Sequence, residues 1–167
     1  MRYFLPLILL LTPALGLADF QIIRAATCST YNLDQSDATV SPHQSPGGAL
    51  MQSAIHYVDG FCAITIPQAS CLEQVTVYGS DTVLQAFTFS VHKAKYANEN
   101  TTVLAQWSSV NALVPWLVTP WKSPLIHEPI DNNTYTYFFY FAGHPLQDPN
   151  GLRIWNISVA YTPGGCL

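Results

Sequence analysis

Hydrophobic and polar residues alternate with a period of two along much of the chain after residue 50. In "EQVTVYG", Val75 and Val77 fall on one side of the segment. In "AFTFSVHK", the apolar side comprises Phe87, Phe89 and Val91, and the polar side comprises Thr88, Ser90 and His92. Nearer the end, Trp155, Ile157, Val159 and Tyr161 alternate with Asn156, Ser158 and Ala160. Because this period is typical of half-buried strands, the pattern predicts an all-β fold, an antiparallel β-sandwich.

The aromatic run "YTYFFYF" differs from these segments because it is apolar on both faces. Tyr135, Tyr137, Phe139 and Phe141 would lie on one side of a strand, and Thr136, Phe138 and Tyr140 on the other. A buried sandwich face and an exposed aromatic platform that stacks on a ligand use the same residue types. Since aromatic side chains favour a pleated, half-buried surface, we interpret the run as core and keep the ligand platform as the alternative.

Polar residues and prolines set the expected boundaries of the domain. Ser, Thr, Asp and Pro are frequent between residues 19 and 48, and "SPHQSPGG" is typical of a loop. We therefore expect an N-terminal polar segment over 19–48 and a single β-sandwich domain over 49–167. The sequence of residues 103–107 predicts a further strand. Pro115, Pro120 and Pro124 indicate an extended connection after it, because proline interrupts a helix.

The chain opens with "MRYFLPLILLLTPALGLA", in which one basic residue precedes an apolar run and a few small residues. This is the pattern of a cleaved signal peptide over residues 1–18, with the cut between Ala18 and Asp19. The apolar run is too short to span a bilayer, although a retained anchor is the alternative. No second long apolar segment follows, so we expect an exported mature chain without a transmembrane segment, periplasmic or extracellular.

Charge restricts the partners of the mature chain. The formal net charge of −4 becomes −5 once Arg2 leaves with the signal peptide. The remaining Lys and Arg residues are scattered, whereas binding to phosphates needs them clustered. We therefore expect no nucleic-acid partner and no attraction to an anionic membrane surface. The low charged fraction of 10% is compatible with a secreted β protein whose outer strand faces are neutral and polar.

All 4 cysteines follow the expected cleavage point. An even number in an exported chain predicts two disulfides, although four cysteines allow three pairings. We expect Cys62–Cys71, which brackets a short turn, and Cys28–Cys166, which lies near the two ends of the mature chain. A metal site is the alternative, but the C-x-x-C spacing of zinc sites is absent, and we expect neither a metal nor a cofactor.

The sequence contains no local motif for catalysis. G-x-S-x-G, H-x-H and H-E-x-x-H are all absent, and His127–Glu128 runs directly into Pro129. A catalytic triad or a glycosidase carboxylate pair meets only in space, so a hydrolase built on the same β-sandwich stays as an alternative to the non-enzymatic protein that we expect. Asn100, Asn132 and Asn156 begin N-x-S/T triplets, which matter only in a host that glycosylates them.

Three tryptophans outside the clearest strands are the candidate binding residues. Trp107, Trp116 and Trp121 lie in or near the proline-rich connection, and their flat apolar faces could stack on sugar rings. The alternative is that these rings pack beneath the connection and cover the edge of the sandwich, because such large side chains are usually mostly buried.

Several segments together resemble a known group of proteins. These are "AITIPQASCLEQVTVYGSD", "AFTFSVHKAKY", "IDNNTYTYFFYF" and "LRIWNISVAYTP". Their order resembles small exported bacterial β-sandwich proteins of jelly-roll type. The matching positions, between about residues 60 and 162, are Ile66, Pro67, Asp81, Lys93, Asp131, Asn132, Tyr135, Tyr137, Val159 and Tyr161. The resemblance implies a jelly-roll-like fold and export, and it transfers no catalytic residue.

Two functional hypotheses follow from these observations. The first is a non-enzymatic exported β-sandwich that binds a glycan or an envelope protein through apolar stacking and neutral hydrogen bonds. The second is a structural envelope or surface protein with no small ligand, whose sandwich pairs with itself or with another chain. Fold alone decides neither, because one fold carries many functions.

Overall fold

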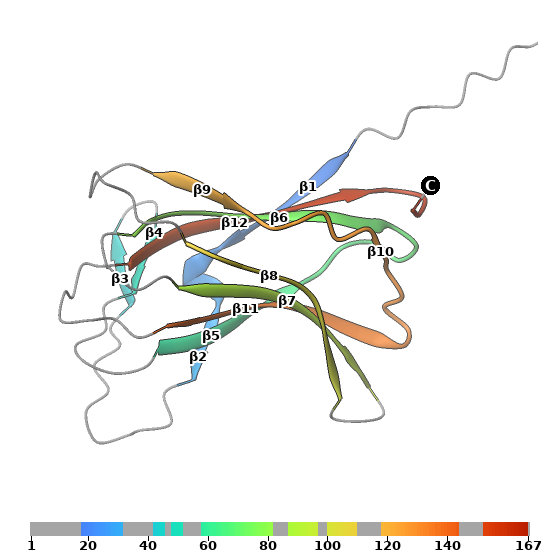
Figure 1. Ribbon diagram of the computed structural model, residues 1–167, viewed down its shortest axis with the longest axis horizontal. Coiled ribbons are helices and arrows are strands. Elements are labelled where there is room, and N and C mark those ends of the chain that lie inside the picture. Colours follow the sequence, from blue (N-terminus) through green and yellow to red (C-terminus); the bar gives the residue numbers. More distant parts are fainter. Residues whose placement is uncertain are drawn as a thin grey trace, which may run out of the picture.

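The structure of the protein is a computed structural model that describes residues 18–31, 42–45, 48–51, 58–81, 87–96, 100–109, 118–143 and 152–166. The proposed signal peptide, except Ala18, and Trp116 lie outside these residues. Two antiparallel sheets pack face to face (Figure 1). Among the described residues there is no α-helix, and no helix has the length and apolar character needed to cross a membrane.

Strands from both ends of the chain contribute to each layer. Sheet A has seven strands: β1 (Asp19–Arg24), β3 (Pro42–Ser45), β4 (Gly48–Met51), β6 (Cys71–Asp81), β9 (Thr119–Lys122), β10 (Glu128–Pro129) and β12 (Leu152–Thr162). Sheet B has five strands: β2 (Ser29–Tyr31), β5 (Val58–Ile64), β7 (Thr88–Lys95), β8 (Thr101–Ser108) and β11 (Tyr135–Gly143). A short 3-10 helix, η1 (Ala25–Thr27), connects β1 to β2.

The strand order is that of a jelly roll. In sheet A, β12 pairs with β6 along one edge and with β1 and β4 along the other. Strand β9 pairs with the opposite edge of β6. In sheet B the order is β5, β11, β7, β8. The chain changes sheet at most connections and remains in one sheet between β3 and β4, between β7 and β8, and between β9 and β10. The fold expected from the sequence is therefore confirmed.

The core lies between the sheets and is lined by the predicted alternate residues. On β6 and β7, Val75, Val77, Phe89 and Val91 are fully buried. Strand β12 departs from strict alternation because its register against β6 shifts between Ile154 and Asn156. This β-bulge leaves Trp155 only half-buried and puts Ile154 in the core in its place.

The polar segment expected before the domain contributes strands to both sheets. Strand β1 pairs with β12 from Asp19 opposite Tyr161 to Arg24 opposite Asn156, and Ile23 is buried against the core. Strand β2 then pairs with β5 in sheet B. The sandwich thus includes residues on the N-terminal side of position 49. Alternation does not mark the inner face of this strand, because Phe20 and Ile22 are each 59% exposed and Ile23 is the buried residue.

The cysteines form two disulfides, as expected, but both expected pairings are wrong. The bridges are Cys28–Cys62 and Cys71–Cys166, so neither Cys62–Cys71 nor Cys28–Cys166 forms. The register explains the first bridge, because Ser29 pairs with Phe61 and this places Cys28 beside Cys62. Cys71 pairs with Thr162 on β12, which brings the following residues up to Cys166 within reach of Cys71.

An ion pair connects the two sheets at one end of the sandwich. The Lys93 Nζ on β7 lies 2.6 Å from the Glu128 Oε1 on β10, and both side chains are less than one-quarter exposed. Lys93 also lies over the ring of Tyr135, 5.0 Å from its centroid. The hydrogen bond to Glu128 raises the pKa of Lys93 above its ordinary value of 10.5.

This ion pair predicts an alkaline loss of stability. Because the pKa of Lys93 is higher in the folded state, the charged lysine contributes to the free energy of unfolding. This contribution is complete below pH 10.5 and is lost as the pH rises through the folded-state pKa. Lys93→Met should therefore lower the free energy of unfolding by about 1 kcal/mol or less near neutral pH, and the difference from the native protein should shrink in the alkaline range. Urea unfolding of both proteins at stepwise pH measures this difference. A difference that stays constant into strong alkali would contradict the prediction.

Candidate functional site

Strand β11 separates its aromatic side chains between the two faces of sheet B. Tyr137, Phe139 and Phe141 are buried in the core, whereas Phe138 and Tyr140 are only half-buried on the outer face. The core interpretation is therefore confirmed for the inner face, while the outer face keeps partly exposed rings, which the ligand-platform alternative requires. The buried set comprises a stacked group in which Phe139 lies against Phe89, Trp107 and Phe141.

The outer face of sheet B carries a cluster of rings from three strands. Phe61 on β5 meets Phe138 on β11 edge to face, with centroids 6.4 Å apart. His92 on β7 stacks flat on Phe138 at 5.1 Å and meets Tyr140 edge to face at 5.9 Å. Because β5 and β7 pair with opposite edges of β11, these rings form a continuous aromatic surface, which we call the sheet B platform.

A hollow of about 500 Å³ opens on this platform. Its lining residues are all uncharged: Phe61, Ala63, Thr136, Tyr137, Phe138 and Tyr140. Ala63 provides a small side chain between the larger rings, and Thr136 adds an exposed hydroxyl group. A neutral, largely apolar hollow with a few hydroxyl groups suits a ligand that is itself uncharged and has both apolar faces and hydroxyl groups.

His92 is held in place by neighbours on the same face. Its Nε2 lies 2.7 Å from the Oγ of Ser90, and burial lowers the pKa of His92 below the ordinary value for histidine. The lowered pKa favours the neutral ring, which adds a flat face to the platform without adding a charge.

Ser90 and His92 have the spacing of a nucleophile and its base, but the surrounding groups differ from a catalytic triad. The Nδ1 of His92 is buried without a hydrogen-bond partner among the described residues, where a triad has a carboxylate that orients the base. Ser90 is also only 5% exposed. The contact between the two side chains holds the His92 ring in its place on the platform.

The tryptophans chosen from the sequence lie elsewhere. Trp121 is 4% exposed and stacks on Phe89 in the core, so it offers no face to a ligand in this structure. Trp107 is half-buried against Phe89 and Phe139, and its Nε1 donates a hydrogen bond to the Trp121 carbonyl oxygen. Both rings therefore pack against the sandwich, as the alternative to sugar binding expected. Trp116 lies outside the described residues.

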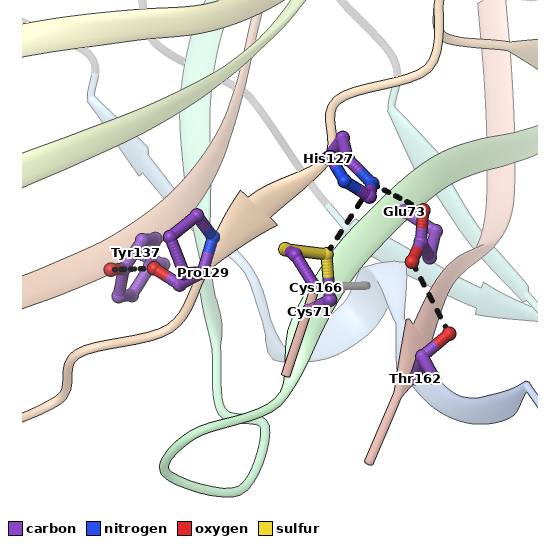
Figure 2. Close-up of a disulfide and its surroundings, with 7 residues drawn as sticks. All are labelled: Cys71, Glu73, His127, Pro129, Tyr137, Thr162 and Cys166. Carbon is purple, nitrogen blue, oxygen red and sulfur yellow. Dashed lines mark hydrogen bonds and ion pairs between the residues drawn. A yellow bond between two sulfur atoms is a disulfide. The ribbon is translucent and has the colours of Figure 1, made fainter. Parts of the chain in front are cut away.

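A second group of reactive side chains surrounds the Cys71–Cys166 bridge (Figure 2). The Nδ1 of His127 lies 3.7 Å from the Sγ of Cys71 and 3.5 Å from the Oε2 of Glu73. The Thr162 hydroxyl group donates a hydrogen bond to the other Glu73 oxygen at 3.2 Å. His127 has a φ of 52°, which is unusual for a residue other than glycine. No sequence motif marks this group, because His127–Glu128 runs into Pro129 and Cys71 lies 56 positions away along the chain.

Comparisons with known proteins identify a shared fold. No protein family matches the sequence, and no curated protein sequence matches it. Eight chains of solved structure match the fold. One is the xylan-binding module CBM15, which is 7% identical with a TM-score of 0.51 over 90% of this chain and 99% of the module. Another is the Stig cyclase Fisc from Fischerella sp. TAU, which is 13% identical with a TM-score of 0.48 over 87% of this chain and 89% of the cyclase. At 7% identity, the likeness to CBM15 shows the β-sandwich fold alone.

Proposed function

We propose that this protein is an exported, non-enzymatic binding module that holds a glycan on the sheet B platform. The observation that carries the proposal is the neutral hollow bordered by Phe61, Phe138 and Tyr140. The apolar faces of sugar rings stack on aromatic side chains, and the hydroxyl groups around the sugar ring need neutral hydrogen-bond partners such as Thr136. An uncharged hollow favours an uncharged sugar chain over an acidic one.

Three further observations support this function. The same β-sandwich fold occurs in CBM15, a xylan-binding module. The two disulfides fit a protein that works in an oxidising compartment, where extracellular glycans are found. The platform is also built on paired strands, and rigid elements hold binding groups more accurately than loops do.

The test is binding of the purified protein to a broad glycan array, followed by titration of the best ligand. Phe138→Ala should weaken binding by about 10- to 100-fold, or about 1.4 to 2.8 kcal/mol, because it removes the ring in contact with both Phe61 and His92. Tyr96→Ala is the matched control, since Tyr96 is an aromatic residue that is 63% exposed and does not border the hollow. Its affinity should equal that of the native protein.

Two results would contradict the proposal. One is the absence of binding to any glycan by the folded protein, which would favour the structural or protein-binding alternative. The other is binding that Phe138→Ala leaves unchanged, which would place the ligand away from the sheet B platform. Far-UV circular dichroism of each variant shows whether the sandwich has kept its fold.

A further inference from the structure

The group around the Cys71–Cys166 bridge has the composition of a metal site. The ligand atoms of Cys71, Cys166 and His127 all lie within 4.8 Å of one another, and a Glu73 oxygen lies 3.5 Å from the same His127 nitrogen. Two sulfurs, one imidazole nitrogen and one carboxylate oxygen are donors that zinc accepts in four-coordinate sites. This is the one such group of three or more donors found among the described residues, and the Cys28–Cys62 bridge has no counterpart there.

The two sulfurs become metal ligands only when the bridge is open. A dithiol reductant supplies two electrons and two protons, the S–S bond breaks, and the reductant itself becomes a disulfide. The two resulting thiols lose their protons when a zinc ion binds, because the thiolate is the ligand. The bridge and the metal site are therefore mutually exclusive states of the same two residues.

The sheet holds three of the four donors independently of the bridge. Cys71 begins β6, where it pairs with Pro129 and Thr162. The Ile126 N–H donates a hydrogen bond to the Glu73 carbonyl oxygen at 2.9 Å, and Glu128 pairs with Leu72. His127 lies between these two attachments, so its ring stays beside β6 when the sulfurs separate. Figure 2 shows the ring lying between the bridge and Glu73.

The fourth donor has the freedom to move. Cys166 follows Gly164 and Gly165, which have φ values of 87° and 99° in the left-handed region that glycine adopts readily. Two Zn–S bonds of about 2.3 Å at a tetrahedral angle place the sulfurs about 3.8 Å apart, so Cys166 must move by only about 2 Å.

A hydrogen bond beyond the four donors orients the carboxylate. The Thr162 hydroxyl group binds Glu73 Oε1, which leaves Oε2 directed at His127. Partners of this kind are common around metal ligands, where they fix the orientation of the donor and raise affinity.

We propose that reduction of the Cys71–Cys166 bridge creates a zinc site formed by Cys71, Cys166, His127 and Glu73. In an oxidising compartment the disulfide joins β6 to the end of β12. Under reducing conditions a zinc ion joins the same elements, so the link between Cys71 and Cys166 is kept after the covalent bond is lost.

The test uses the full chain, reduced with a water-soluble phosphine that is removed by gel filtration before Co²⁺ is added as a spectroscopic probe for the zinc site. Reduced native protein should bind one Co²⁺ per chain with a sulfur-to-metal charge-transfer band, and Zn²⁺ should displace the probe. Unreduced protein should show no such band. His127→Ala should weaken Zn²⁺ binding by more than about 100-fold, and Thr162→Val by about 10- to 100-fold.

The second disulfide is the internal control. Cys28→Ser/Cys62→Ser should keep the band after reduction, whereas Cys71→Ser/Cys166→Ser should lose it. The proposal is overturned if reduced native protein binds no Co²⁺, if it unfolds by circular dichroism and stays unfolded with Zn²⁺, or if His127→Ala binds as tightly as the native chain. Loss of the band in the Cys28→Ser/Cys62→Ser variant would overturn it as well.

Discussion

Phe139→Ala is expected to lower the free energy of unfolding by about 3–5 kcal/mol, the usual range for a large core side chain. Phe139 is fully buried, and its ring lies against Phe89, Trp107 and Phe141. The substitution leaves a cavity at the centre of this stack, and backbone pairing on both edges of β11 limits how far the neighbours can close it. Urea unfolding followed by circular dichroism measures the effect.

Phe138→Ala is the matched control for this prediction, because it deletes the same atoms one residue earlier on the same strand. Phe138 is half-buried on the outer face of sheet B, so its loss should destabilise the protein by about 1 kcal/mol. Equal destabilisation by the two substitutions would show that β11 has two buried faces. That result would remove the physical basis of the sheet B platform as a binding surface.

The second prediction concerns the relative value of the two disulfides. Cys71 and Cys166 are separated by 95 positions and Cys28 and Cys62 by 34, so opening the first bridge frees the longer loop in the unfolded chain. Chain-entropy arithmetic gives about 4.7 kcal/mol for the Cys71–Cys166 bridge and about 3.8 kcal/mol for the Cys28–Cys62 bridge. Cys71→Ser/Cys166→Ser should therefore be the less stable of the two double variants.

The two pairs form a fair comparison because each has one deeply buried sulfur, on Cys71 at 0% exposure and on Cys62 at 2%. Burial of a serine hydroxyl group in place of sulfur should thus have a similar effect in both variants. Urea unfolding without reductant gives the two free energies. A larger loss for Cys28→Ser/Cys62→Ser would show that local contacts, and not loop length, determine the contribution of each bridge.

The inner faces of single strands could be predicted from the sequence because the alternation of apolar and polar residues within a strand indicates which face is buried. Alternation identified the core faces of β6 and β7. It failed for Trp155 because a β-bulge depends on the pairing partner, which the strand's own residues do not specify. The choice of cysteine partners failed for the same reason. Proximity of Cys28 and Cys166 to the chain ends is no guide, because antiparallel pairing of the six-residue β1 with β12 carries the chain about 20 Å away from Tyr161 before it reaches Cys28.

The candidate site was visible only in part. The outward aromatic residues of β11 could be recognised because that run is apolar on both faces, but nothing near Phe61 or Ala63 marked β5 as the neighbouring wall of the hollow. Trp121 was chosen for its residue type. In the structure it packs inward because β9 pairs with β6 and directs this ring toward Phe89. The His127 group could not be found from sequence, since the turn of the chain at His127 and its contact with β6 both depend on the tertiary fold.

The position of β12 has a consequence for the order in which the protein folds. This strand pairs with β6 along one edge and with β1 and β4 along the other, so within the described residues the N-terminal strands of sheet A reach the rest of that sheet only through it. During synthesis, β1 and β4 therefore wait without their partner until nearly all of the described chain has been made. The β3–β4 and β6–β9 pairs can form earlier, but sheet A is joined into one layer only when β12 is in place, and until then the edges that β12 covers are open to aggregation.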